Sequence, residues 1–260
     1  MSLKEKVALV TGGGSGLGEA SALALARAGA RLALLGRDRD ELDRVAGAIE
    51  RAGSEALSLV ADISDMESML ESVSRIIEHW GRLDIVFANA GINGVWAPIE
   101  QLTADDWQQT IDINLSGTFY TIKAAVPHLK KQGGSVIITS SINGTRVFSN
   151  TGATAYSCSK AGQVALAKML ALELAPNRVR VNVICPGAIE SSIDENTEKR
   201  NLEAVEPPVE YPEGKVPLTG GKPGKAEDVG ELVLFLASDA SKHITGTEIW
   251  IDGAQSLLMG

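Results

Sequence analysis

Residues 7–18 read VALVTGGGSGLG, a short apolar run followed at once by a glycine-rich turn. An apolar run of this length is typical of a strand buried on both faces, and a helical spacing begins at Gly16. Glycines let the backbone turn tightly, and they let a pyrophosphate approach the free N–H groups at the start of a helix. The spacing is Gly-x-x-x-Gly-x-Gly, for which a plain β–α turn is the alternative interpretation. Its place after the first predicted strand favours a dinucleotide site.

The same order of strand, turn and helix recurs along the chain. Seven apolar runs are predicted strands, at residues 7–10, 31–35, 56–60, 84–88, 135–140, 178–184 and 248–251. Segments of helical period lie between them, at residues 16–28, 40–52, 66–80, 104–131, 155–175 and 226–237. This alternation predicts an α/β fold: one Rossmann-type doubly wound domain over residues 1–260, with a mostly or wholly parallel seven-stranded sheet and helices on both faces. Only residues 190–217 break the rhythm, as a lid, a binding segment or a disordered loop would.

The composition excludes several classes of function. With a net charge of −9 and no basic stretch, the chain is not expected to bind a nucleic acid. No run approaches the length of a membrane span, and the first residues lead straight into a strand, so we expect a cytoplasmic protein. Cys158 and Cys185 form neither a disulfide framework nor a zinc site, and His79, His128 and His243 are scattered without ligand partners. No metal is therefore expected.

In a doubly wound sheet, ligands bind at the carboxyl ends of the strands, so the residues that follow each strand are the candidates for a site. The second predicted strand ends at Leu35-Gly36-Arg37. An acidic residue at the position of Gly36 would bind the adenosine ribose, whereas Arg37 suits a 2′-phosphate. The sequence therefore favours NADP over NAD, although a solvated surface charge is the alternative interpretation of Arg37.

Polar or small residues also follow the next two predicted strands. Asp62 and Ile63 follow the third strand, and Asn89-Ala90-Gly91 follows the fourth. Either group is compatible with simple turn chemistry. Because parallel strands end at one edge of the sheet, we expect these residues to form one wall of the cofactor site.

Tyr156 and Lys160 stand four residues apart in the predicted helix 155–175. Residues at this spacing share one helical face, so a phenol and an ammonium can point into one cleft. A solvated helix face is the commoner outcome for such a pair. Asn114 is a polar residue in an apolar stretch of the predicted helix 104–131, and it is either a hydrogen-bonded core residue or part of the same site.

Taken in order, these motifs resemble those of the short-chain dehydrogenase/reductase family, in its simple form, across essentially the whole chain. The resemblance rests on Thr11-Gly12-x-x-x-Gly16-x-Gly18, Asp62, Asn89-Ala90-Gly91, Asn114, Ser141, Tyr156-x-x-x-Lys160 and Pro186-Gly187-x-Ile189-x-Ser191. It implies a cofactor site that contains Thr11, Gly12, Ser15, Gly16, Leu17, Gly18, Arg37, Asp62, Ile63, Asn89, Ala90, Gly91, Tyr156, Lys160, Pro186, Gly187, Ile189 and Ser191.

The resemblance also implies four catalytic roles. Tyr156 is expected to be the general acid in reduction and the general base in oxidation. Lys160 supplies the positive charge that favours the phenolate, and it binds the nicotinamide ribose. Ser141 donates a hydrogen bond to the reacting oxygen. Asn114 holds a water that links Lys160 to solvent.

The chain departs from the family pattern at two points. The gap from Ser141 to Tyr156 is a couple of residues longer than usual, which would place Asn143 where the serine is expected. We retain Ser141, because Ser141-Ile142-Asn143-Gly144-Thr145 follows the fifth predicted strand in the family's local pattern. Ser191 stands where threonine is more common, and its hydroxyl keeps the expected contact with the cofactor carboxamide.

Two classes of function remain. The leading prediction is an NAD(P)-dependent oxidoreductase that transfers hydride between the cofactor and a small-molecule carbonyl or secondary alcohol. The alternative is a cofactor-binding sensor that has kept the fold and lost the chemistry. Within the enzymes, the resemblance suggests 3-oxoacyl thioester reductases and polyol or sugar dehydrogenases. Residues 190–217, the expected substrate loop, are acidic and mildly disfavour an anionic carrier-protein partner.

Side chains around the proposed cleft give further expectations. Trp96, Phe148 and Tyr211 either line a substrate pocket or provide simple hydrophobic cover. Cys158 points about 200° around the helix from Tyr156 and is expected to pack. The resemblance also implies a homotetramer in which strand 248–251 and the small residues near Ala161 and Ala165 contact partner subunits, although such residues could equally pack on the sheet.

Overall fold

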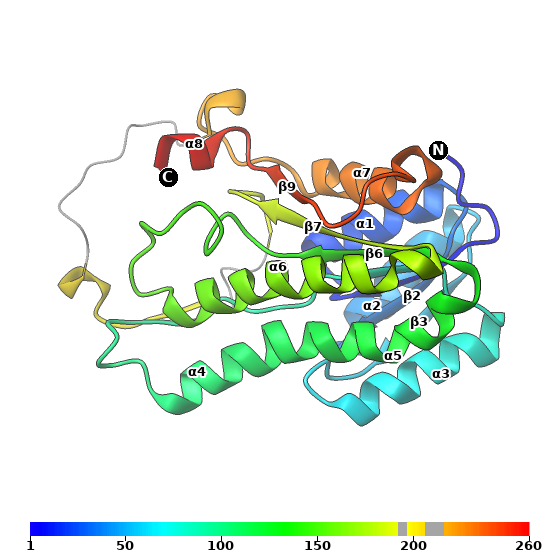
Figure 1. The fold of residues 1–260 in the computed structure, drawn as a ribbon, viewed down its shortest axis with the longest axis horizontal. Coiled ribbons are helices and arrows are strands. Elements are labelled where there is room, and N and C mark those ends of the chain that lie inside the picture. The colour runs from blue at the N-terminus through cyan, green and yellow to red at the C-terminus, as the bar shows by residue number, and fades with distance from the viewer. Residues whose placement is uncertain (192–196, 206–215, 260) are drawn as a thin grey trace.

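A computed structural model describes residues 1–191, 197–205 and 216–259. At its centre is a seven-stranded sheet in the order β3-β2-β1-β4-β6-β7-β9, in which every neighbouring pair is parallel (Figure 1). The strands are β1 (Val7–Thr11), β2 (Arg31–Gly36), β3 (Ala56–Val60), β4 (Ile85–Ala88), β6 (Gly134–Thr139), β7 (Val179–Pro186) and β9 (Glu248–Ile251). The predicted α/β fold is confirmed, and the order of the strands reverses between β1 and β4.

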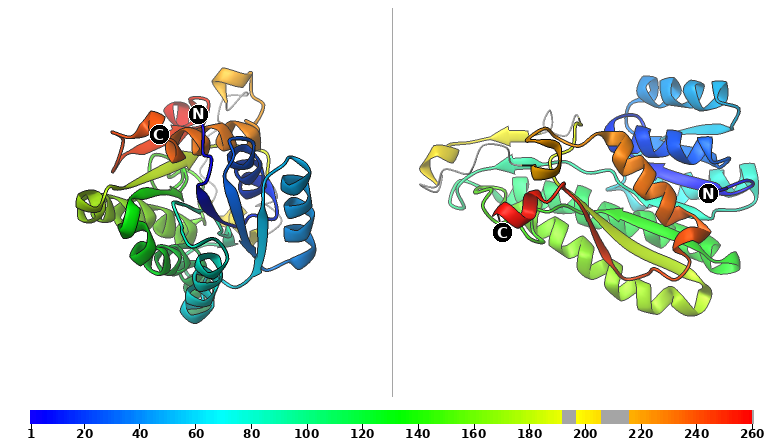
Figure 2. Two further views of the ribbon diagram at one scale, coloured as in Figure 1. Left: turned by 90° about the vertical axis from the view of Figure 1, so that its right-hand side faces the viewer. Right: turned by 90° about the horizontal axis from the view of Figure 1, so that it is seen from above.

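Two layers of helices cover the sheet (Figures 1 and 2). One face carries α3 (Met66–Trp80), α5 (Gly117–Gln132) and α6 (Thr154–Leu174), and the other carries α1 (Gly16–Arg27), α2 (Arg39–Arg51) and α7 (Ala226–Ala237). Side-chain oxygens cap two of these helices: Asp38 accepts from the main-chain N–H groups of Asp40 and Glu41, and Asp65 accepts from that of Glu67. These caps explain where the helical pattern begins after each turn.

The core consists of two apolar clusters, one on each face of the sheet. In β1 the side chains alternate between them, because Val7 and Leu9 join one cluster while Ala8 and Val10 join the other. All four residues are fully buried. Burial of a valine or leucine side chain stabilises a fold by roughly 1.5–3 kcal/mol, so this central strand anchors the sheet that positions the glycine-rich turn.

The predicted helix 104–131 is one long element with an irregular middle. It comprises α4 (Ala104–Ile111), a π-helical turn η1 (Asp112–Ser116) and α5. The hydrophobic spacing does not reveal the π-turn, because one widened turn changes the apolar period very little. Asn114 lies inside this turn.

Several short elements were not predicted. A small second sheet pairs β5 (Gly94–Trp96) with β8 (Thr197–Lys199), so part of the segment 190–217 is an ordered strand. Helix α8 (Gln255–Met259) follows β9 and lies at the opposite end of the molecule from the N-terminus (Figure 2). Four 3-10 turns complete the described elements, at Ala175–Asn177, Leu202–Ala204, Pro217–Thr219 and Asp239–Ser241. Among the described residues, no helix is long and apolar enough to cross a membrane.

Candidate active site

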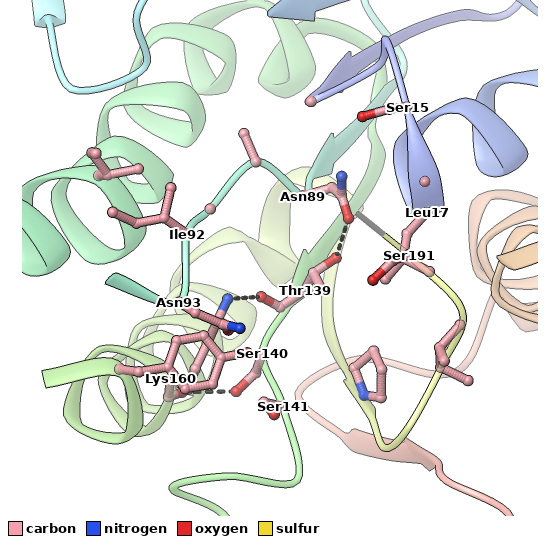
Figure 3. Close-up of a pocket in the computed structure, with 18 of the residues that line it drawn as sticks. Ser15, Leu17, Asn89, Ile92, Asn93, Thr139, Ser140, Ser141, Lys160 and Ser191 are labelled. Carbon is pink, nitrogen blue, oxygen red and sulfur yellow. Dashed lines mark hydrogen bonds between the residues drawn. The ribbon is translucent and has the colours of Figure 1, made fainter. Parts of the chain in front are cut away.

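A cavity of about 770 Å³ lies at the carboxyl ends of the strands (Figure 3). Its wall contains most of the residues predicted from the sequence, including Ser15, Arg37, Ser141, Tyr156 and Lys160. Three predicted residues do not line the cavity and lie behind its wall: Thr11, Gly18 and Asn114. The predicted site residues therefore converge on one place, and these three support it from behind.

The glycine-rich turn requires glycine for two separate reasons. Gly12 and Gly16 adopt φ angles of +65° and +51°, which favour glycine over residues with a side chain. A Cβ atom on Gly18 would lie 1.9 Å from the carbonyl oxygen of Gly12, so α1 can approach the turn only without a side chain there. The turn thus brings the N-terminus of α1 against the cavity, where main-chain N–H groups favour an anion.

Thr11 ties two strand ends together. Its hydroxyl oxygen accepts from the main-chain N–H groups of Asn89 and Ala90, at 3.0 and 3.1 Å. The Asn89 amide donates to the main-chain oxygen of Thr11 at 3.2 Å and accepts from the Thr139 hydroxyl at 3.1 Å (Figure 3). The ends of β1, β4 and β6 are therefore held in register behind the cofactor wall.

The end of the cavity beside β2 and β3 carries charges of both signs. Arg37 lines it, but so do Asp38 and Glu41. The Glu41 side chain lies against the glycine turn, because a Cβ atom on Gly14 would be 2.9 Å from the Glu41 Cβ and 3.0 Å from its Oε2. The pKa of Asp62 is lowered, chiefly by the hydrogen bond from the Ser64 hydroxyl and in smaller part by the charge of Arg37. Arg37 is thus a cation among mostly acidic side chains.

Tyr156 and Lys160 project from α6 toward the other end of the cavity, away from Arg37. The Lys160 Nζ lies 5.4 Å from the centroid of the Tyr156 ring and donates to the main-chain oxygen of Thr139 at 3.0 Å. Only 2% of Lys160 is exposed. Burial lowers the pKa of Lys160 to about 8, because a charged ammonium is costly away from water. The solvated-face interpretation of the pair is therefore wrong.

The two serines after β6 have different surroundings. The Ser140 hydroxyl donates to the main-chain oxygen of Lys160 at 2.8 Å, so it holds the end of β6 to α6 (Figure 3). The Ser141 hydroxyl oxygen instead accepts from the main-chain N–H of Asn143 at 3.1 Å, which leaves its own proton to donate. Both Ser141 and Asn143 line the cavity. This geometry supports the choice of Ser141 as the hydrogen-bond donor.

Asn114 is fully buried and makes hydrogen bonds with both groups of its amide. Its Oδ1 accepts from the main-chain N–H of Ile92 at 2.8 Å, and its Nδ2 donates to the Ile92 oxygen at 2.9 Å and to the Ser159 hydroxyl at 3.1 Å. A Cβ atom on Gly91 would lie 2.9 Å from the Asn114 Oδ1 and 3.6 Å from the Lys160 Nζ. Gly91 therefore leaves space between the amide oxygen and the ammonium. Asn114 is both a core residue and a neighbour of the site.

The π-turn that carries Asn114 is fastened from α6. The Gln163 amide donates to the main-chain oxygen of Asn114 at 2.9 Å and to the Thr118 hydroxyl at 2.7 Å, and the Thr118 hydroxyl donates to the same main-chain oxygen at 2.7 Å. Gln163 and Thr118 are 1% and 2% exposed. Gln163 lies three residues beyond Lys160, so one helix positions both the ammonium and the turn opposite it.

The aromatic and thiol expectations have mixed outcomes. Trp96 lines the cavity, and its ring centroid lies 6.5 Å from that of Tyr156. Phe148 is 72% exposed and is not part of the cavity wall, and Tyr211 lies outside the described residues. The expectation that Cys158 packs is wrong, because its side chain is exposed on the face of α6 away from the cavity.

Several residues at the site escaped the sequence analysis: Thr139, Asn93, Asn150 and Gln163. Thr139 is the last residue of β6, so the rule that strand ends carry the site could have found it. Asn93 and Asn150 lie on connecting segments that only the tertiary fold brings to the cavity. Gln163 is a buried polar residue on a helix, and helical spacing alone does not separate it from a solvated residue.

The cavity fits a dinucleotide at one end and holds a phenol beside a buried ammonium at the other. The class that such a site defines is the oxidoreductases that use a nicotinamide cofactor. The chain matches the family model described as enoyl-(acyl carrier protein) reductase over residues 12–254. It is 36% identical over 254 residues to a 3-oxoacyl-[acyl-carrier-protein] reductase of Thermotoga maritima, with 97% of this chain and 98% of that protein covered.

Two solved structures extend the comparison. A 3-ketoacyl-ACP reductase from Sinorhizobium meliloti 1021 is 51% identical, with a TM-score of 0.93 and coverage of 97% of this chain and 99% of that chain. An NAD+-bound xylitol dehydrogenase is 30% identical, with a TM-score of 0.87 and coverage of 96% and 99%. The chain belongs to the short-chain dehydrogenase/reductase family, and it is an oxidoreductase that acts on CH–OH or C=O groups with a nicotinamide cofactor.

Proposed function

We propose that Tyr156 is the general acid and base of this oxidoreductase, assisted by Lys160, Ser141 and Asn114. The observation that carries the proposal is the buried Lys160 ammonium 5.4 Å from the Tyr156 ring. A phenol normally titrates near ~10, and a positive charge this close favours its ionised form. Tyr156 then takes a proton from an alcohol or returns one to a carbonyl oxygen at a working pH near neutral.

The other side chains have separate tasks in this mechanism. The Ser141 hydroxyl donates to the reacting oxygen and so orients it beside the phenol. The main-chain oxygen of Thr139 fixes the Lys160 Nζ. Asn114 faces Lys160 across the space that Gly91 leaves, where a water would connect the ammonium to solvent. The nicotinamide cofactor, when bound, supplies or accepts the hydride.

The cofactor would lie along the wall that the sequence predicted. Its pyrophosphate would meet the main-chain N–H groups at Ser15, Gly16 and Leu17, and its nicotinamide end would lie near Ile189 and Ser191. Ser191 is close to the turn, since a Cβ atom on Gly16 would be 3.5 Å from the Ser191 Cβ. The adenosine end would lie by Arg37, Asp62 and Ile63.

Arg37 supports a preference for NADP, with NAD as the alternative. Asp38 and Glu41 line the same end and oppose a 2′-phosphate, so the preference depends on one guanidinium. Titration of NADPH and NADH by fluorescence tests it, with Arg37→Gln as the variant and the exposed Arg39→Gln as its matched control. We expect only Arg37→Gln to weaken NADPH binding. Tenfold tighter binding of NADH by the unchanged protein, about 1.4 kcal/mol, contradicts the preference.

Turnover is tested with a panel of carbonyls and secondary alcohols and the preferred cofactor. Oxidation or reduction of the cofactor that Tyr156→Phe abolishes supports the enzyme. Tight cofactor binding without turnover of any panel member supports the sensor alternative instead.

Assembly, location and the loop are further proposals. Residues 190–217 act as the substrate loop, since β8 within them pairs with β5, which ends at Trp96.

The exposure of Ala161 and Ala165, together with exposed fractions of 73% for Met169 and 82% for Leu172, supports a tetramer assembled partly through α6. The two unpaired cysteines are consistent with the reducing cytoplasm. Analytical ultracentrifugation tests the assembly, and a stable monomer contradicts it.

A further inference from the structure

Three asparagines from two separate segments line the cavity at the end that holds Tyr156. Asn93 follows β4, whereas Asn143 and Asn150 belong to the connection between β6 and α6. Asn93 lines the same cavity as Lys160 and as Ser140 and Ser141, the two serines that follow β6 (Figure 3). A pocket for a purely apolar substrate has little use for three amides, so their number at this end calls for a physical reason.

Asn143 and Asn150 form a pair with complementary groups left over. The Asn150 Nδ2 donates to the Asn143 Oδ1 at 2.9 Å. Within the part of the chain that the structure describes, the Asn143 Nδ2 and the Asn150 Oδ1 have no protein partner. One group is a donor and the other an acceptor. A hydroxyl between them can accept from Asn143 and donate to Asn150, so the pair matches an alcohol better than it matches a hydrocarbon.

The third amide lies deeper and is fixed. The Asn93 Nδ2 donates to the Thr197 hydroxyl at 2.7 Å, and the Asn93 main-chain oxygen accepts from the Trp96 indole at 3.3 Å. Asn93 is only 6% exposed. It therefore fastens β8 to the pocket wall and sets the Trp96 ring opposite Tyr156. That ring gives the C–H groups of a small substrate an apolar surface.

Cations are scarce at this end. Among the described residues that line the cavity, the positive side chains are Arg37, at the adenosine end, and Lys160, whose Nζ is held by Thr139. Glu190, the first residue of the substrate loop, also lines the cavity and is acidic. A substrate whose handle carries phosphate groups, such as a carrier-bound thioester, finds no free cationic partner among the described residues of this wall.

We propose that Asn143 and Asn150 form a subsite for a second oxygen of the substrate, and that the substrate is an uncharged, poly-oxygenated alcohol or carbonyl. This inference rests on the proposed function, because it places the second oxygen relative to the carbonyl that Tyr156 protonates. Ser141 binds the reacting oxygen, and the amide pair two and nine residues later binds its neighbour. Trp96 limits the size of the carbon skeleton.

The test compares substrates that differ by one hydroxyl. We would measure kcat/KM with the preferred reduced cofactor for 2-hydroxycyclohexanone, for cyclohexanone, and for the coenzyme A thioester of 3-oxobutanoate, whose handle carries phosphate groups. The unchanged protein should favour the hydroxyketone over the plain ketone by about tenfold, the effect of one well-placed hydrogen bond. It should favour both cyclic ketones over the thioester.

Variants show which residues cause the preference for the hydroxyketone over the plain ketone. Asn143→Leu keeps the volume and removes the amide, and Asn150→Ala removes its partner. Each should lower the ratio of the two kcat/KM values at least threefold, and Asn177→Ala, at the opposite edge of the sheet, should leave the ratio unchanged. Cofactor affinity and melting temperature show that each variant is folded.

The outcomes separate the two proposals. A ratio near one in the unchanged protein, a ratio that both variants preserve, or a preference for the thioester overturns the subsite while leaving the proposed function intact. Cofactor binding without turnover of any of the three compounds overturns the proposed function and, with it, the subsite.

Discussion

The two ends of the cavity are built in different ways. The cofactor end depends mainly on the main chain, through the positive φ angles of Gly12 and Gly16 and the close approach of Gly18 to the Gly12 oxygen. One side chain, the Thr11 hydroxyl, joins two strand ends there. The substrate end depends on contacts between distant segments. There β5 pairs with β8, and the main-chain N–H of Ala97 donates to the Gly152 oxygen at 3.1 Å.

This difference teaches where the protein tolerates change. A main-chain cradle is the same for any sequence that adopts it, so the cofactor end constrains few side chains beyond its glycines. The substrate end also contains side-chain pairs on loops, such as Asn143 with Asn150, and exchanging one pair alters the pocket without disturbing the sheet. Fold and cofactor therefore follow from one end, and specificity from the other.

The largest expected effect separates the two ends most clearly. Tyr156→Phe removes one oxygen and keeps the ring that packs by Trp96. We expect kcat/KM to fall by about a thousandfold, in the range for loss of a general acid or base, while cofactor affinity changes less than about threefold. Steady-state kinetics and fluorescence titration measure the two quantities. Tyr120→Phe on α5 is the matched control, and equal losses of turnover and cofactor affinity would break the comparison.

The second prediction concerns the cost of the buried ammonium. The pKa of Lys160 is lowered by burial from 10.5 to about 8, so between these values the unfolded chain holds more protons than the folded one. The free energy of unfolding therefore gains about 3 kcal/mol from this residue as the pH rises from about 8 to 10.5. Below about 8 the lysine is charged in both states, and the full penalty of its burial remains.

Urea unfolding between pH 7 and 10.5 measures this contribution. The comparison is between Tyr156→Phe and the double variant Tyr156→Phe/Lys160→Met, because the tyrosine no longer titrates in either. As the pH rises, the free energy of unfolding of Tyr156→Phe should increase relative to that of the double variant. A difference independent of pH would show that the ammonium is not penalised and that the substrate end carries no such strain.

The sequence predicts the cofactor end because its determinants are local. Residues 7–18 contain a strand, a turn that needs glycine and the start of a helix, and each can be read from neighbouring residues. The parallel sheet follows from the repetition of that unit. Tyr156 and Lys160 are predictable as a pair because four residues in a helix fix their common face.

The substrate end is less predictable because its determinants are long-range. Thr197–Lys199 has no apolar alternation and is a strand only because Gly94–Trp96 offers an edge about a hundred residues away in sequence. The amides of Asn143 and Asn150 resemble ordinary loop residues until the connection folds over the cavity. The π-turn at Asn114 is hidden for a different reason, since one widened turn hardly alters the apolar period.

A third prediction tests whether α6 positions Asn114. Gln163→Leu removes the amide that holds the main-chain oxygen of Asn114, and it also removes the buried Gln163 Oε1, which has no partner in the described structure. Stability should change little, because the lost hydrogen bonds are offset by the removal of an unsatisfied group. We expect kcat to fall about tenfold with KM nearly unchanged.

Proton transfer gives the readout that a purely structural role would not move. If Gln163 positions the Asn114 side of the proton path, the solvent isotope effect on kcat should rise in Gln163→Leu. Gln109→Leu on α4, an exposed glutamine outside the π-turn, is the matched control. An unchanged kcat and isotope effect in Gln163→Leu would show that the π-turn holds its shape without α6.

The smallest expected effect lies at the ion pair that fastens the substrate loop. The Arg200 guanidinium donates to the Asp106 carboxylate at 2.7 Å and to Glu198 at 2.6 Å, and the main-chain N–H of Arg200 donates to the Trp96 oxygen at 2.9 Å. The side chain of Arg200 is 35% exposed, so water and salt weaken the pair, and its loss should have only a small effect. The main-chain bond to Trp96 survives the substitution and keeps β8 near its place.

Arg200→Gln should therefore raise KM for the substrate about two- to threefold while kcat and cofactor affinity stay the same. The control is Arg27→Gln, which breaks the remote pair with Glu231 at 3.5 Å and should change none of these quantities. Added salt screens the pair in the unchanged protein, so the two KM values should converge as ionic strength rises. A loss of cofactor affinity in Arg200→Gln would instead mean that the two ends of the cavity are coupled through the loop.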